Sequence, residues 1–277
     1  MPVIALTQEM GSLAKDVADQ LARELNLSTM RHEVVEHVAS KMHVSTSLIN
    51  RIREGKAGTF ERLRTDRDSM AVYTAEEVLE SAARGGVVLR GWGATCLLRP
   101  VPHVVCVRIT RPLPRRVEWL MAHLDTDDAG FAEAEIRRSD QAHAARMHAQ
   151  FGVTWGDPLL YDMVLNTERL SVQTCVEQIA ALLGRPEFSA TPQSRALLQG
   201  MALQAHVRSA LKANPATQDV SITIDSSEGQ VTLRGIVLKE GELAAAAQVA
   251  AGVPGVTGVD NQLRLMATSR LFPSARA

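Results

Sequence analysis

The sequence predicts a doubly wound, mostly parallel α/β domain followed by a small α+β domain. Apolar strands alternate with amphipathic helices through the longer, N-terminal part of the chain, as in βαβ units. The runs "GVVLRGWG" and "HVVCVRIT" are apolar on both faces, which is typical of strands covered by helices on both sides. The pattern changes after "GRPEFSATPQS", a stretch with prolines and small polar residues. We therefore expect two domains of different class.

The first domain is predicted to span residues 1–184. It begins with a strand at 3–6 and a helix at 12–25 whose apolar residues recur every four positions, and Ser12 is expected to cap this helix. The remaining predicted elements are helices at 33–42, 45–52 and 74–84, the two apolar strands with a short helix at 94–98 between them, helices at 113–124 and 129–150, a strand over "YDMVLNT" and a helix at 171–183.

The second domain is predicted to span residues 199–267. A helix at 199–212 precedes a hairpin made of "DVSITID" and "QVTLRGIVL". An alanine-rich helix and the closing strand "VTGVDNQLRLM" complete the order αββαβ. Residues 185–198 are interpreted as a linker, and residues 268–277 as a frayed tail.

Composition narrows the class of protein. The chain has 277 residues and a formal net charge of -1, so the overall charge predicts no nucleic-acid partner. Its three cysteines lie in apolar stretches without a CxxC spacing, as expected of reduced thiols. No apolar run approaches the roughly 20 residues that span a bilayer, and the first residues do not have the pattern of a signal peptide. We expect a soluble, cytoplasmic protein without a transmembrane segment.

Four segments of the first domain resemble, in the same order, the cytidylate-kinase-like family of P-loop nucleoside monophosphate kinases. They are "TQEMGSLAKDVADQLA" at the family's phosphate loop, "VVLRGWGA" at a strand ending in Gly-Arg-Gly, "AEIRRSDQAHAARM" at the arginine-bearing lid, and "WGDPLLYDMVLNTERLSVQTCVEQI" at the last strand and helix. The resemblance implies a P-loop kinase fold. It also implies transfer of the γ-phosphate of ATP, with Mg²⁺, to a nucleoside monophosphate or a related phosphorylated acceptor.

The resemblance places ATP at the first strand–helix turn. Backbone N–H groups and the helix dipole attract phosphate at such a turn. Gly11, Ser12 and Lys15 would hold the nucleotide, with Ser12 ligating Mg²⁺ and Lys15 adding a positive charge in catalysis. Leu13 and Ala14 replace two glycines of the family's loop, and their β-carbons narrow the space for phosphate.

The lid segment is implied to contribute to catalysis. Arg138 and Arg146 would neutralise charge on the transferred phosphoryl group, and Asp140 matches an aspartate of the family. Gln141 and His143 stand where the family has basic residues.

The acceptor is implied to bind near the strand that ends at "LRGWG". Arg90 and Trp92 flank Gly91, and Trp92 replaces the family's arginine that holds the acceptor phosphate. Strand alternation places Arg90 and Trp92 on the same side, and Trp92 is equally compatible with stacking on a base and with a place in the core. Arg31 stands at an aspartate of the family and reverses the charge there.

The second domain resembles a BON domain over about residues 199–267. "VSITIDSSEGQVTLRGIV", an alanine-rich helix and "VPGVTGVDNQLRL" are the matching segments. The resemblance implies an interaction module whose partner is a protein or a phospholipid.

Three functions stay open for the whole chain. The first is an active kinase, and the second is a non-catalytic nucleotide sensor or scaffold whose BON-like domain recruits a partner. The third is a kinase whose acceptor is more anionic than CMP, as Arg31 and "RIREGKAG" suggest.

Overall fold

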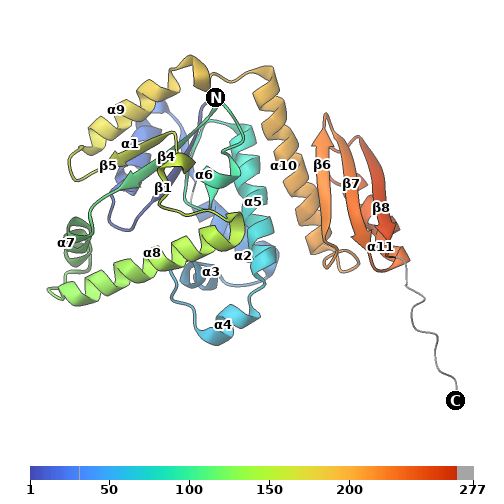
Figure 1. The fold of residues 1–277 in the computed structure, drawn as a ribbon, viewed down its shortest axis with the longest axis horizontal. Helices are drawn as coiled ribbons and strands as arrows, with labels where there is room; N and C mark the ends of the chain where they lie inside the picture. Colours follow the sequence, from blue (N-terminus) through green and yellow to red (C-terminus); the bar gives the residue numbers. More distant parts are fainter. Residues whose placement is uncertain (31, 267–277) are drawn as a thin grey trace. The chain divides into compact units, whose positions relative to one another are not determined.

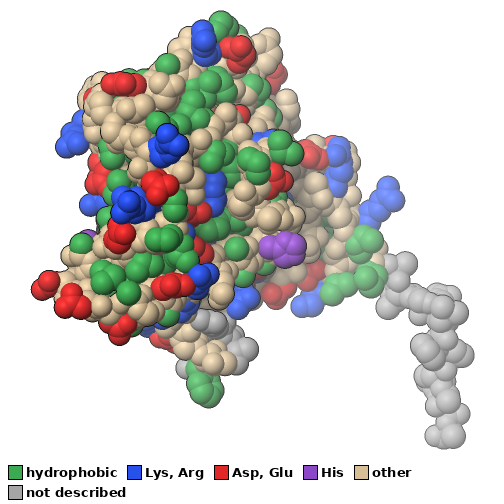
Figure 2. All heavy atoms as spheres, turned by 60° about the vertical axis from the view of Figure 1, so that its left-hand side comes forward, with side chains coloured by type: hydrophobic (Ala, Val, Ile, Leu, Met, Phe, Trp, Pro, Cys, Tyr) green, Lys and Arg blue, Asp and Glu red, His purple; other side chains and the backbone are tan. Residues whose placement is uncertain are grey.

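The computed structural model describes residues 1–30 and 32–266 of the chain. It divides into two compact units, Met1–Leu198 and Gln199–Ala277. Arg31 and the predicted tail at 268–277 lie outside the described residues. Lys and Arg side chains are interspersed with Asp and Glu side chains over the face drawn in Figure 2. No helix among the described residues is long and apolar enough to cross a membrane.

The first unit is built on a five-stranded parallel sheet of order β2-β3-β1-β4-β5. Its strands are β1 (Val3–Gln8), β2 (Ser28–Met30), β3 (Val87–Arg90), β4 (Val104–Thr110) and β5 (Met163–Asn166). β3 is buried along its whole length, and β4 is buried except at its last residue. This burial explains why both strands are apolar on both faces.

Helices cover both faces of this sheet (Figure 1). On one face lie α1 (Ala14–Leu25) and α9 (Val172–Leu183), which pack on each other and on the sheet in a single apolar core. The other elements before the lid segment are α2 (His32–Met42), α3 (Thr46–Arg53), α4 (Thr59–Arg64), α5 (Arg67–Arg84) and α6 (Ala94–Leu97), of which α5 packs on β3 and α6 on β1. The predicted doubly wound α/β fold is confirmed.

Two helices bring distant segments to the end of the sheet. α7 (Leu113–Leu124) follows β4, and α8 (Ala129–Phe151) packs on α7 before the chain passes through a short 3-10 turn, Pro158–Leu160, into β5. Figure 1 shows α8 running from α7 toward α3 and α5. The carboxyl ends of β1, β3 and β4 therefore face side chains from α7 and α8, where ligands bind in open α/β sheets.

The second unit has the predicted αββαβ order. The C-terminal part of α10 (Pro192–Ala213) packs with α11 (Glu240–Ala251) on a sheet of order β6-β7-β8. β6 (Ile222–Ser227) pairs antiparallel with β7 (Gln230–Val237), and β8 (Gly258–Leu265) pairs parallel with β7. A second apolar core lies between these helices and the sheet. A short 3-10 turn, Pro186–Phe188, precedes α10.

Three local predictions are wrong. Ser12 does not cap α1, because Leu13 occupies the N-cap position in the left-handed region and no side chain caps this helix. α5 begins at Arg67 rather than residue 74, because the carboxylate of Asp66 accepts the N–H groups of Asp68 and Ser69. α10 begins at Pro192 rather than residue 199, within the stretch 185–198.

The early start of α10 has a local cause. The N–H of Thr191 donates to Ser194 Oγ, and the N–H of Ser194 donates to Thr191 Oγ1, at 3.0 Å each. Pro192 then stands at the first helical position, where a missing N–H costs least. The "TPQS" sequence is thus a helix start.

Candidate functional site

The turn between β1 and α1, residues 9–13, bends sharply at the carboxyl edge of the sheet. The N–H of Ser12 donates to Glu9 O at 3.1 Å and closes the turn. Gly11 has a φ of 78° and Leu13 a φ of 60°, so both lie in the left-handed region. Glycine adopts this conformation without strain, whereas leucine does so at a cost in free energy.

This β1–α1 turn presents groups that fit a phosphate and its metal ion. Within the described part of the chain, the backbone N–H groups of residues 13–16 have no hydrogen-bond partner, as expected at an uncapped helix start. The Ser12 side chain is buried, and its Oγ also has no partner among the described residues. Lys15 is exposed one residue into α1. Unpartnered donors at a helix N-terminus attract anions, and a buried hydroxyl oxygen without a partner suits a nucleotide-bound Mg²⁺.

Helix α7 covers the β1–α1 turn from outside the sheet. A β-carbon on Gly11 would lie 3.1 Å from the carbonyl oxygen of Arg116 and from the ring of Trp119, so any other residue would require these neighbours to shift. The guanidinium of Arg116 donates to the carbonyl of Met10 at 2.7 Å. On the other side, the hydroxyl of Thr167, after β5, donates to Ser12 O at 2.8 Å. The conformation of the turn is therefore supported from both sides.

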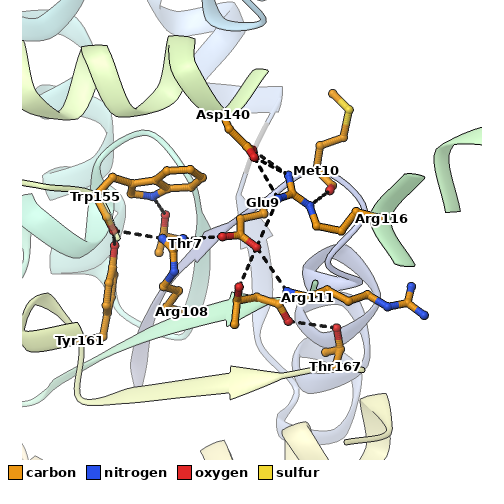
Figure 3. A network of polar contacts seen from close by, with 11 residues as sticks. Thr7, Glu9, Met10, Arg108, Arg111, Arg116, Asp140, Trp155, Tyr161 and Thr167 are labelled. Atoms are coloured by element: carbon orange, nitrogen blue, oxygen red, sulfur yellow. Dashed lines mark hydrogen bonds and ion pairs between the residues drawn. The ribbon is translucent and has the colours of Figure 1, made fainter. Parts of the chain in front are cut away.

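A carboxylate and a guanidinium organise the polar network beside this turn (Figure 3). Glu9 accepts from Arg108 at 2.6 Å, from the hydroxyl of Thr110 at 2.7 Å and from a backbone N–H of residue 111 at 3.3 Å. Arg116 forms a bidentate pair with Asp140 of α8, with N–O distances of 2.7 and 2.9 Å. Asp140, which was predicted to be catalytic, therefore balances the charge of a buried arginine at the loop.

Arg108 is fixed by aromatic side chains as well as by Glu9. Its guanidinium lies 4.4 Å from the ring centre of Trp155 and 5.7 Å from that of Tyr161. Trp155 Nε1 donates to the hydroxyl of Thr7 at 3.0 Å, and Tyr161 donates to the carbonyl of Trp155 at 2.7 Å. The segment that precedes β5 is thus bound to the ends of β1 and β4 (Figure 3).

A cavity of about 540 Å³ lies next to this network, between α3, α5, the loop after β3 and α8. It is lined by apolar and small side chains together with a few polar groups. Its lining includes Arg53, Asp68, Trp92, His143 and Arg146. Of the predicted site residues, the structure thus brings Trp92 and Arg146 together in one cavity.

Two arginines of this cavity are positioned by an aromatic ring and by a backbone carbonyl. The guanidinium carbon of Arg53 lies 3.6 Å from the ring centre of Trp92, so the arginine is stacked on the indole. Both terminal nitrogens of Arg146 donate to the carbonyl of Arg53 at 3.3 Å. No carboxylate among the described residues pairs with Arg146, and desolvation lowers its pKa. Asp68, whose carboxylate lines the same cavity, forms no ion pair with Arg146 within the described part of the chain.

His143 lies among these cations and is uncharged. Burial, together with the nearby charges of Arg146, Arg53 and Arg108, lowers its pKa from 6.5 to about 3. Its ring packs against that of Trp155, with ring centres 4.2 Å apart. A neutral imidazole here can form hydrogen bonds without adding to the positive charge.

Other predicted residues lie elsewhere. Arg138 forms an ion pair with Glu135 on its own helix, and its side chain is not part of the cavity lining. Arg90 is buried at the end of β3 and is also absent from the lining, so strand alternation did not place it beside Trp92 in the cavity. The chain leaves regular strand geometry at Gly91, with φ of 83°, and the alternation ends there.

Sequence reasoning missed the residues that surround the site. Glu9, Arg108 and Arg116 were not singled out, although Glu9 lies in the quoted loop. Arg108 offered one signal: it is a lone charged residue within an otherwise apolar strand, a position that requires a buried partner.

Comparison with known proteins identifies both parts of the chain. The sequence model of the Cytidylate kinase-like family matches residues 3–169, more than half of the chain. The chain belongs to this family. The model of the BON domain matches residues 201–267, which confirms the second resemblance.

The curated relatives include two cytidylate kinases. The cytidylate kinase of Pyrobaculum islandicum is 26% identical over 191 residues, covering 66% of this chain and 96% of that protein. The cytidylate kinase of Pyrobaculum aerophilum is 25% identical over 177 residues, covering 64% of this chain and 89% of that protein. Among solved structures, an uncharacterised protein from Eubacterium ventriosum shares the fold, with a TM-score of 0.53 and 18% identity over 67% of this chain and all of that one.

Proposed function

We propose that the first unit binds Mg²⁺-ATP at the β1–α1 turn and transfers the γ-phosphate to a nucleoside monophosphate or related phosphorylated acceptor. The observation that carries the proposal is the set of unpartnered donors at this turn. Membership of the Cytidylate kinase-like family and the curated kinases among its relatives support it.

The chain's own residues would divide the work as follows. The N–H groups at the start of α1 bind phosphate oxygens, and Lys15 adds a charge beside them. Ser12 Oγ would hold the Mg²⁺ ion, which would neutralise charge at the phosphates. Arg146 supplies a positive charge from α8 on the acceptor side. Catalysis of this kind depends on position and charge and needs no covalent intermediate.

Calorimetric titration with Mg²⁺-ATP tests the proposal. We expect Lys15→Ala to weaken binding by about tenfold or more, equivalent to about 1.4 kcal/mol. Arg23→Ala is the matched control, because Arg23 is also an exposed cation on α1 but lies two turns further from the loop. An equal effect of both substitutions, or no binding of ATP at millimolar concentration, would contradict the proposal.

A second candidate function is a non-catalytic nucleotide sensor or scaffold. Two observations favour it: Arg116 at the turn is already paired with Asp140, and Leu13 and Ala14 carry β-carbons where the family's loop has glycines. ADP formation with CMP, UMP, AMP or GMP as acceptor separates the two functions. Turnover that Lys15→Ala abolishes supports the kinase, whereas ATP binding without turnover on any of the four supports the sensor.

The BON domain is proposed to recruit a protein or phospholipid partner to either kind of first unit. Co-sedimentation of the full chain with vesicles of anionic phospholipid tests the lipid branch. Sedimentation no greater than that of a control protein would exclude lipid and leave a protein partner.

A further inference from the structure

Glu9 is the first residue of the β1–α1 turn, and its carboxylate is bound to β4 and the residues after it (Figure 3). The carboxylate accepts hydrogen bonds from Arg108 at 2.6 Å, from the hydroxyl of Thr110 at 2.7 Å and from the backbone N–H of residue 111 at 3.3 Å. Arg116 Nη1 lies 3.6 Å from the same carboxylate. Both oxygens of Glu9 are thus engaged, and its side chain is only 13% exposed.

Arg108 occupies a position that is costly for a charged residue. β4 is buried except at its last residue, and the side chain of Arg108 is 8% exposed. The strand register places Arg108 opposite Thr7, two residues before Glu9. The attraction within a buried ion pair does little more than offset the desolvation of its charges, so an apolar pair would stabilise the sheet about as well. A role at the turn therefore explains this pair better than stability does.

The side chain of Glu9 is close enough to the start of α1 to reach it. The N–H of Ser12 donates to the carbonyl of Glu9 at 3.1 Å, so residues 9–12 form a turn whose end Cα atoms lie within about 7 Å of each other. The N–H groups of residues 13–16 have no hydrogen-bond partner within the described part of the chain. Such donors and the helix dipole attract a carboxylate as well as a phosphate. A Glu9 side chain released from β4 would therefore compete with phosphate.

We infer that Glu9 and Arg108 are positioning residues for the nucleotide. Arg108 holds the carboxylate of Glu9 on β4 and so keeps the N–H groups at the start of α1 available for phosphate oxygens. Both residues act through the turn. The naming of ATP as the ligand rests on the proposed function. The competition between Glu9 and the donors of α1 is a property of the turn, and it can be measured without ATP.

A double-mutant cycle on the affinity for ATP tests this role. Mg²⁺-ATP is titrated into the full chain by calorimetry, in which the stoichiometry counts the folded molecules that bind. We expect Arg108→Met to weaken binding by about tenfold or more, because it releases Glu9. Glu9→Gln in the Arg108→Met chain should restore the affinity to within about threefold of the wild type, since an uncharged amide competes poorly for these donors. A purely structural pair would change the stability or the stoichiometry but not the affinity of folded molecules.

Amide hydrogen exchange provides a measurement without nucleotide. In the wild type the N–H groups of residues 13–16 should exchange rapidly, because they have no partner among the described residues. In Arg108→Met the carboxylate of Glu9 should bind some of them and slow their exchange by about threefold or more. Rapid exchange should return in the Glu9→Gln/Arg108→Met chain. Absence of ATP binding by the wild type would contradict the proposed function, whereas the exchange rates would still decide the role of the pair.

Tyr161→Phe is the matched control. The hydroxyl of Tyr161 donates to the carbonyl of Trp155, which also accepts from Arg108, so its loss disturbs the surroundings of Arg108 without removing a donor to Glu9. This variant should bind ATP within about twofold of the wild type. Thr110→Val is the second variant if Arg108→Met fails to fold, because it removes another donor to Glu9. It should weaken ATP binding by about threefold, and Glu9→Gln should reverse the loss.

Two results would overturn the role of the pair. One is an Arg108→Met chain that folds and matches the wild type both in affinity for ATP and in exchange of residues 13–16. The other is a defect of Arg108→Met that Glu9→Gln reverses in neither measurement, because a released carboxylate would then not be its cause.

Discussion

His143 shows how a single residue reports on the charge around the cavity. In the folded chain burial and three arginines hold its pKa at about 3, whereas the ordinary value is 6.5. As the pH falls from 6.5 toward 3, the unfolded chain binds a proton at this residue and the folded chain does not. The fold therefore loses stability over this window, by at most about 1.4 kcal/mol per pH unit.

This sign leads to a prediction at the residue scale. Between pH 7.5 and 5.5, the wild-type chain should lose about 1.4 kcal/mol more unfolding free energy than His143→Gln, because the glutamine does not titrate. Urea denaturation at the two pH values measures the difference. His148→Gln, an exposed residue on the same helix, is the control and should behave as the wild type. Equal pH dependence in wild type and His143→Gln would mean that the pKa of His143 is not lowered in the folded chain.

At the scale of elements, Gly93 allows the last residue of α8 to pack closely against the loop after β3. Gly93 has a φ of 71°, and a β-carbon on it would lie 2.6 Å from the ring of Phe151, the last residue of α8. Gly152 has a similar φ of 67°, but nothing lies within 4 Å of such a β-carbon. The two positions share the backbone strain of a left-handed residue and differ only in packing.

This contrast separates strain from packing. Gly152→Ala should cost about 1 kcal/mol of unfolding free energy from backbone strain. Gly93→Ala should cost about 1–3 kcal/mol more, because the ring of Phe151 must move out of its packed position. Chemical denaturation of the two variants measures both values. If they were equally destabilised, close packing of Phe151 on this loop would be disproved.

At the scale of the whole molecule, the chain has two separate apolar cores. Ile179 belongs to the core of the first unit and Leu233 to that of the second, and both side chains are fully buried. The two sets of core residues have no member in common, so burial of apolar side chains stabilises each unit separately.

Separate cores predict two transitions in differential scanning calorimetry. Ile179→Ala should lower the midpoint of one transition and Leu233→Ala that of the other, since each substitution costs about 2–5 kcal/mol within its own unit. A single transition that both substitutions shift equally would show that the two units unfold together. In that case α10 would couple them, because it begins in the first unit and ends in the second.

Most helices and strands were predictable because they depend on patterns of residues that are close along the chain. The apolar runs of β3 and β4 and the lengths of α7 and α8 follow from local periodicity and from stop signals, and the structure confirms them. The extended start of α5 and α10 was missed because side-chain caps were not recognised at Asp66 and Thr191.

The sequence by itself determined the two domain types, the family and the order of most elements, since each depends on residues that are close along the chain. The short strand β2 and the short helix α4 were not predicted. Only the tertiary structure decided which charges meet at the site. Arg138 and Arg146 stand on one helix and looked equivalent, yet one faces Glu135 and the other a carbonyl of α3. Arg116 meets Asp140 across two helices. Periodicity indicates which face of an element is buried, whereas the partner of a buried charge depends on what packs against that face.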